Sequence, residues 1–185
     1  MHRIIKHLFI NSIIFLTLSQ TLMADTKENI ARAGDILVLL LPTTAYAKTF
    51  YESDGKGALQ FTESIATTMS VTYVLKYSID AERPNGENNR SFPSGHTSSA
   101  FSSATFLQLR YGWEYGVPAY AVATFVAWSR VYSDHHYTRD VIAGATLGVV
   151  GSYIFTTTYD SDIHVTPIVN NGIYGLSISS TFNSY

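Results

Sequence analysis

Apolar segments of helical length, separated by short polar loops, succeed one another along this 185-residue chain and leave few alternatives for its fold. About five such segments follow residue 24, with no internal repeat and no low-complexity linker. Hydrophobic residues make up 46% of the chain and charged residues 14%, which is enough apolar material for one core. The sequence therefore predicts an all-α fold, a compact bundle of about five to six helices.

The expected helices are these apolar segments, and they lie at about residues 32–50, 58–79, 94–109, 117–132 and 137–159. In the second of them Phe61, Ile65, Met69 and Tyr73 recur every four positions, as in an amphipathic helix. That helix must end before Pro84, because the residue preceding a proline is pushed out of the α region. The last three segments are rich in Ala, Gly, Ser and Thr, so their backbones can approach one another closely.

None of these segments offers about 20 clean apolar residues in a row, the length that crosses a bilayer. The run Ile36–Leu41 is broken by Pro42, and the mean hydropathy of the chain is only +0.08. These features favour a soluble or peripheral bundle, although short helices lined with small residues can still span a membrane.

The two ends of the chain differ from the middle. Residues 1–24 resemble an export signal, with Arg3 and Lys6 before an apolar stretch and Ala24 before Asp25. We expect a signal peptide cleaved after Ala24 or an uncleaved N-terminal anchor, so that the helical domain, residues 25–160, leaves the cytoplasm or faces away from it. In residues 161–185, the segments 165–169 and 173–178 flank an Asn-Asn-Gly turn, and large apolar residues alternate with small ones in the second segment, which predicts a C-terminal β-hairpin.

Charge and cysteine content exclude several kinds of function. Twelve Lys and Arg against 14 Asp and Glu give a formal net charge of −2, which offers no global field for gathering nucleic acid. The chain has no cysteine, which excludes disulfides, thiolate metal sites and cysteine nucleophiles. Any chemistry on an anion must therefore depend on cations placed locally.

Two polar stretches have the composition of an anion-binding site. Lys76 and Arg83 are seven residues apart, so both can lean toward one point at the end of the second helix. Ser94 and Gly95 open the third helix, followed by His96; a helix start with a serine cap and a glycine suits phosphate binding. Taken alone, each stretch is more often structural, as cations complementing a helix dipole or as an ordinary capped helix.

A third stretch contains Arg130, His136 and Asp140. His136 and Asp140 are four residues apart, and on one helical face the carboxylate can accept the Nδ1 proton and leave Nε2 free to attack. His135 is five residues from Asp140 and is expected to point away from it. We therefore expect His136, not His135, to be the nucleophile.

Together these stretches resemble the tripartite signature of the type 2 phosphatidic acid phosphatase and vanadium haloperoxidase superfamily. Its three parts are matched in order and spacing by Lys76 with Arg83-Pro84, by Pro93-Ser94-Gly95-His96, and by Ser129-Arg130 with His136 and Asp140. The resemblance covers residues 76–140, and the expected helices fit that family's helical bundle.

The resemblance implies a role for each motif residue and a metal-independent phosphatase without a cofactor. His136 would attack phosphorus, Asp140 would orient it, and His96 would protonate the leaving oxygen. The phosphate oxygens would be bound by Lys76, Arg83, Arg130, Ser94 and the amide of Gly95. Vanadate is then expected to inhibit as a mimic of the transition state.

The substrate stays open at this stage, between a lipid-linked phosphomonoester or pyrophosphate and the small phosphoester of a soluble periplasmic acid phosphatase. The aromatic content, 14% of the chain, and the compact helices favour a phosphorylated lipid at the periplasmic face of a bacterial inner membrane. A vanadate-dependent haloperoxidase and a non-catalytic envelope bundle are the other readings. The oligomeric state is not indicated.

Overall fold

A computed structural model describes the backbone of residues 2–159, 163–170 and 173–180, and the side chains of residues 25–159. Five α-helices confirm the all-α prediction: α1 (His2–Tyr51), α2 (Gly55–Ser78), α3 (Gly95–Tyr111), α4 (Trp113–Tyr132) and α5 (Thr138–Phe155). In the tail, β1 (Ile163–Asn170) and β2 (Ile173–Ser180) pair antiparallel. The side chains of the expected signal segment and of the expected hairpin lie outside the described residues.

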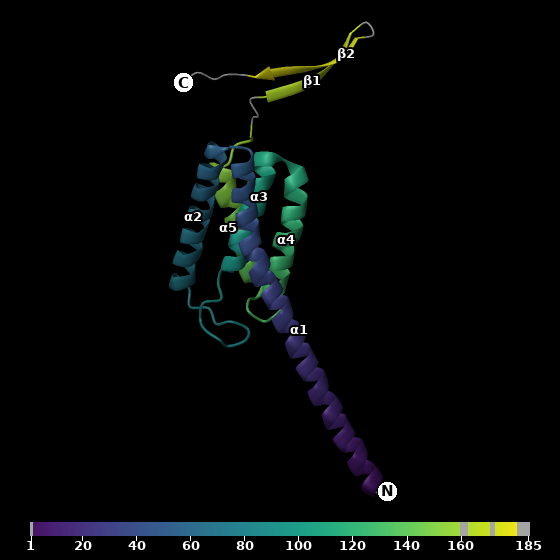
Figure 1. The fold of residues 1–185 in the computed structure, drawn as a ribbon. Helices are drawn as coiled ribbons and strands as arrows, with labels where there is room; N and C mark the ends of the chain where they lie inside the picture. The colour runs from purple at the N-terminus through teal and green to yellow at the C-terminus, as the bar shows by residue number, and fades with distance from the viewer. Residues whose placement is uncertain (1, 160–162, 171–172, 181–185) are drawn as a thin grey trace.

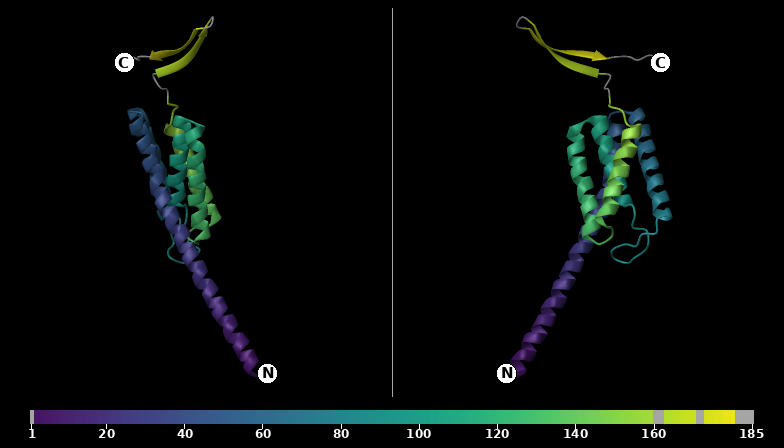
Figure 2. Two further views of the ribbon diagram at one scale, coloured as in Figure 1. Left: turned by 45° about the vertical axis from the view of Figure 1, so that its right-hand side comes forward. Right: turned by 180° about the vertical axis from the view of Figure 1, so that it is seen from behind.

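Helix α3 is the centre of the bundle and packs against each of the other four helices (Figures 1 and 2). Its buried residues are mostly small: Ala100 and Ala104 are fully buried, as are several Ser and Thr side chains. Phe106 supplies bulk and contacts Phe61 of α2, with ring centroids 4.7 Å apart. Small side chains let the surrounding helices approach α3 closely.

Helices α3 and α5 approach each other closely, because glycines of α5 face the backbone of α3. A Cβ atom on Gly148 would lie 2.5 Å from the carbonyl oxygen of Ser98, and one on Gly144 would lie 2.5 Å from that of Ser94. Real Cβ atoms do not approach backbone so closely, so these positions admit only hydrogen. The glycines therefore fix the distance between the two helices.

Helix α2 buries only part of the face that its apolar pattern predicts. Phe61 is buried, but Tyr73 is half exposed, and the buried stripe is formed by Ser64, Thr68 and Thr72. Thr72 donates a hydrogen bond to Ser98 of α3 at 3.0 Å. The amphipathic pattern is therefore met in part: Phe61 is buried and Ile65 packs against the core, while the neighbouring helices pack too closely for large side chains along the rest of the buried face.

Helix α1 passes through Pro42 without ending, although a proline removes one donor from the helical hydrogen-bond ladder. It continues to Tyr51, and its N-terminal half projects beyond the bundle (Figure 1). By length and composition, its residues Asp25–Tyr51 are apolar enough to cross a membrane.

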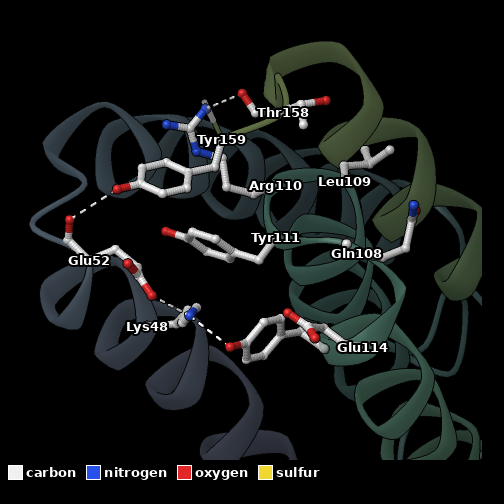
Figure 3. Close-up of a pocket in the computed structure, with 11 residues that line it drawn as sticks. Lys48, Glu52, Gln108, Leu109, Arg110, Tyr111, Glu114, Thr158 and Tyr159 are labelled. Carbon is white, nitrogen blue, oxygen red and sulfur yellow. Dashed lines mark hydrogen bonds and ion pairs between the residues drawn. The ribbon is translucent and has the colours of Figure 1, made fainter. Parts of the chain in front are cut away.

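An ion pair closes the end of the bundle where α1, α3 and α5 stop. Asp54 caps α2 and accepts hydrogen bonds from Arg110 at 2.6 and 2.7 Å, and both side chains are about 95% buried. Arg110 also donates to the carbonyl oxygens of Thr157 and Thr158, and Figure 3 shows the guanidinium reaching the chain there. These contacts hold the segment after α5 in an extended form, so α5 ends at Phe155 and not near Tyr159 as expected.

We expect Gly148→Ala to lower the free energy of unfolding by about 1–3 kcal/mol, because the new methyl group must push α5 away from α3. Gly55→Ala is the matched control, since a Cβ atom there meets nothing within 4 Å. Thermal unfolding of the two variants beside the parent protein measures the difference. Equal stability of both variants would contradict the proposed helix contact.

Candidate active site

Three segments that are distant in sequence meet at the end of the bundle opposite Arg110. They are the loop between α2 and α3, the start of α3, and the turn between α4 and α5 (Figure 1). The amide of Asn85 donates to the carbonyl of Asp134 at 3.1 Å, and the amide of Ser94 donates to that of Asp140 at 3.0 Å. These backbone hydrogen bonds bring the three sequence motifs together.

His136 and Asp140 lie side by side, but not for the reason expected from the sequence. His136 precedes α5 and belongs to the turn, while Asp140 lies in the first turn of the helix and accepts a hydrogen bond from the amide of Tyr137 at 2.9 Å. The Nδ1 atom of His136 is 3.5 Å from Oδ2 of Asp140. The helical-face argument was wrong, although the two side chains are neighbours.

Ser91 is a third member of this group that the sequence did not reveal. Its Oγ donates to Oδ2 of Asp140 at 2.5 Å and lies 3.5 Å from Nδ1 of His136. Ser91, His136 and Asp140 are all almost fully buried. No local pattern distinguishes Ser91 from other loop serines, because its role depends on a contact across 49 residues.

The environment of His136 favours a neutral imidazole. Burial, followed by the charges of Lys76 and Arg83, lowers the pKa of His136 far below its ordinary value, and Asp140 opposes this shift. No described residue hydrogen-bonds to Nε2. The ring can therefore present an unprotonated nitrogen at neutral pH.

Lys76 and Arg83 form a group of positive charge with too few anionic partners. Burial and the neighbouring Arg83 lower the pKa of Lys76 to about 8, and its ammonium group donates to the carbonyl of Arg90 at 2.7 Å. Arg83 bonds to Glu87 at 3.2 Å, while its Nε is buried without a hydrogen-bond partner among the described residues. A buried donor without an acceptor costs folding free energy, so an anion that accepts this hydrogen bond would stabilise the site.

The start of α3 supplies the remaining predicted residues. Ser94 is the N-cap of α3, as expected, and its Oγ accepts hydrogen bonds from the amide and the hydroxyl group of Thr97. Gly95 and His96 follow, and both line a cavity of about 450 Å³ together with Lys76 and Arg83. His96 and His136 thus lie at the same end of the bundle, near the same two cations.

Arg130 is buried at the end of α4 and turned toward α1. Its Nη1 donates to Oδ1 of Asp35 at 2.7 Å, and its Nη2 donates to the carbonyl of Ala31. The same Oδ1 of Asp35 is 2.9 Å from Nε2 of His96. Asp35 is therefore a second residue of the site that the sequence did not reveal, because nothing in the first helix marks it.

His135 has a different environment from that of His136. Its Nδ1 is 2.8 Å from Oγ of Ser133, and it lines a separate surface cavity with Lys27, Arg32 and Asp35. It makes no contact with Asp140 that parallels that of His136. The two histidines therefore have different neighbours, and the choice of His136 as the nucleophile stays a prediction.

The arrangement can hold a phosphate-sized anion against a neutral imidazole. Among the residues that the structure describes, no group of three His, Asp or Glu side chains is arranged to hold a metal ion. A larger cavity of about 580 Å³ lies near Arg110 and is lined by Lys48 and Tyr111 (Figure 3), far from the sequence motifs. We therefore place the candidate site at the His136 end.

Known proteins resemble this chain in sequence and in fold. A profile of the PAP2 superfamily matches residues 57–163. The chain is 43% identical over 79 residues to a lipid A 1-phosphatase of Porphyromonas gingivalis, covering 40% of this chain and 18% of that protein. It is 31% identical over 137 residues to a lipid A 4'-phosphatase of Helicobacter pylori, covering 68% of this chain and 69% of that protein.

Among solved structures, the chain resembles the first transmembrane PAP2 type phosphatidylglycerolphosphate phosphatase from Bacillus subtilis. The TM-score is 0.55 and the sequence identity 26%, over 71% of this chain and 74% of that one. The matched family range begins within α2, so α1 and Asp35 lie outside it.

We expect inorganic phosphate or orthovanadate to bind the purified protein, and Arg83→Met to weaken that binding about 10- to 100-fold, because a charge-assisted hydrogen-bond donor is lost. Arg32→Met is the control, since Arg32 is mostly exposed and pairs with Glu28. Isothermal titration calorimetry measures both. Equal effects of the two substitutions would show that Arg83 does not contact the anion.

Proposed function

The chain belongs to the PAP2 superfamily, and we propose that it is a metal-independent phosphatase that cleaves phosphate from a lipid-linked phosphomonoester or pyrophosphate through a phosphohistidine intermediate. The observation that carries this proposal is the buried pair of His136 and Asp140 beside Lys76 and Arg83, because the buried Nε atom of Arg83 has no hydrogen-bond partner among the described residues.

The chemistry needs two displacements at phosphorus. In the first, Nε2 of His136 forms a bond to phosphorus while the bond to the leaving oxygen breaks, and that oxygen takes a proton from His96. In the second, water attacks phosphorus, His96 takes the proton of the water, and the nitrogen–phosphorus bond breaks to release phosphate. His136 gains positive charge in the first step, and Asp140 stabilises it. The 3.5 Å separation of His136 and Asp140 is of the kind that can shorten when substrate binds.

The cations stabilise the charge that spreads over the equatorial oxygens during each displacement. Lys76, Arg83 and Arg130 are candidates to bind these oxygens, with the amide of Gly95 at the start of α3. Their positions are fixed by the fold before substrate binds, so little reorganisation is needed during the reaction. Ser94 contributes as the cap that holds this helix start in place.

The outer surface of the bundle supports a location in a membrane. Each helix has a stretch without Asp, Glu, Lys or Arg; these stretches are residues 36–47, 64–75, 97–109, 115–129 and 141–155. Large apolar side chains within them are exposed: Ile36, Leu39, Leu40, Val71, Val74, Val117, Ile142, Val150 and Ile154. A bundle with small polar groups inside and apolar groups outside suits a lipid surrounding better than water. This observation argues against the expectation of a soluble bundle.

The cavity beside His96 supports a substrate with an apolar tail. Lys76, Arg83 and His96 line one part of it, whereas the remaining lining is largely apolar: Val38, Leu39, Pro42, Met69 and Tyr73. A phosphate group and an acyl chain can therefore occupy one continuous space. The three relatives named above act on lipids, which agrees with this substrate class. We place the reaction in the bacterial cell envelope, at the periplasmic face of the inner membrane.

We expect His136→Ala to lower kcat at least about 1,000-fold, because the nucleophile is removed. His135→Ala, the matched control, is expected to stay near the activity of the parent protein. Phosphate release is measured from phosphatidate, phosphatidylglycerol phosphate, lipid A, undecaprenyl pyrophosphate and an aryl phosphate. A strong preference for the aryl phosphate would favour a nonspecific acid phosphatase and contradict the lipid proposal.

We expect a bell-shaped dependence of kcat/KM on pH with its maximum on the acid side of 6.5. Burial, then Lys76 and Arg83, lowers the pKa of His136, so the nucleophile stays unprotonated in mild acid. Burial, then the charge of Arg130, lowers the pKa of His96, so the proton donor is lost as the pH rises toward 6.5. Both limbs belong to the coupled site. A flat profile between about pH 5 and 8 would contradict these roles.

A further inference from the structure

Asp35 brings a negative charge from α1 into the group of residues proposed to bind phosphate. One carboxylate oxygen, Oδ1, accepts from Nε2 of His96 at 2.9 Å and from Nη1 of Arg130 at 2.7 Å. In the proposed reaction, these two donors face the substrate: His96 protonates the leaving oxygen, and Arg130 binds a phosphate oxygen.

The backbone of α1 is held tightly at this point. A Cβ atom on Gly34 would lie 2.2 Å from Oγ of Ser129 and 2.5 Å from Nη2 of Arg130, and Arg130 donates to the carbonyl of Ala31. Ala31 is buried. The position of Asp35 is therefore set by a fixed helix and not by a mobile loop.

The side chain of Asp35, in contrast, can move. It is 53% exposed, whereas that of Arg130 is 3% exposed. A rotation about its side-chain bonds would carry the carboxylate into solvent while α1 stays in place. The donors would then be free for another anion.

We infer that Asp35 is an internal competitor of the substrate: in the empty site its carboxylate occupies the position of a phosphate oxygen between His96 and Arg130, and substrate must displace it. The inference rests on the proposed function, because it uses the roles given there to His96 and Arg130. It concerns a residue outside the range matched by the family.

If substrate must displace Asp35, replacing Asp35 has the opposite effect on phosphate affinity from replacing a residue that binds phosphate. Phosphate gains its bonds to His96 and Arg130 only by breaking those of Asp35, and the displaced carboxylate remains as a nearby negative charge. Removing this charge should make phosphate binding stronger, while removal of a residue that merely positions Arg130 should make it weaker. The direction of the change therefore separates the two roles.

The test compares Asp35→Asn with the parent protein and with Glu28→Gln. Glu28 lies two turns earlier in α1 and is exposed, so its replacement removes one negative charge without touching His96 or Arg130. Dissociation constants for orthovanadate and inorganic phosphate are measured by calorimetry, and KM and kcat are measured with the best lipid substrate.

For Asp35→Asn we expect both dissociation constants and KM to fall about 3- to 10-fold. The substitution removes a partly exposed charge that competes with the ligand for His96 and Arg130. Glu28→Gln should change them less than about twofold. Asp35→Glu, which keeps the charge, should bind orthovanadate no more tightly than the parent protein. Asp35→Ala is a second neutral variant, since alanine favours the helix, and should show the same tightening.

Unchanged or weaker vanadate binding in the neutral variants would overturn the inference, as would equal tightening in Glu28→Gln. Failure of the proposed function would look different. In that case the parent protein itself would neither bind orthovanadate nor release phosphate from any substrate, whatever the residue at position 35.

Discussion

The approach of α5 to α3 is the contact on which the candidate site depends. Gly144 and Gly148 let the two backbones meet, and at the end of this contact the amide of Ser94 bonds to the carbonyl of Asp140. The start of α3 and the start of α5 are thereby held side by side. His96 lies in the first turn of α3, and His136 lies just before α5. The packing of these two helices in the middle of the bundle therefore determines how the two histidines are placed at its end.

Positive charge in excess of its carboxylate partners is the second constraint on this site. Burial lowers the pKa of His136, and the charges of Lys76 and Arg83 nearby lower it further, so that this imidazole stays neutral. Such a site binds an anion well because folding already brings the cations together, so that ligand binding does not have to supply the free energy of their mutual repulsion. Asp35 partly compensates the charge at Arg130 and His96, so the empty site is less unfavourable than the motif residues alone would make it.

The sequence predicted the helices and the motif residues but not how the motif residues are linked. Some helix ends follow from local signals, such as the Ser94 cap at the start of α3, whereas the end of α5 depends on contacts with the distant Arg110 and was predicted too late. Ser91 and Asp35 were missed because each acts through a contact with a distant segment. The buried face of α2 was predicted only in part, because its neighbours pack too closely there for large side chains.

The inverted polarity of the bundle also explains why the site lies at its end. Lys76, His96, Arg130 and Asp140 each stand directly beside the uncharged stretch of their helix, and these four positions form one boundary at the same end of the bundle. In a bilayer, that boundary is where lipid phosphate groups lie, while the acyl chains extend along the apolar stretches. A cavity that joins Lys76 and His96 to Val38 and Met69 crosses this boundary. A lipid would then need to move little from its resting depth for its phosphate to reach His136.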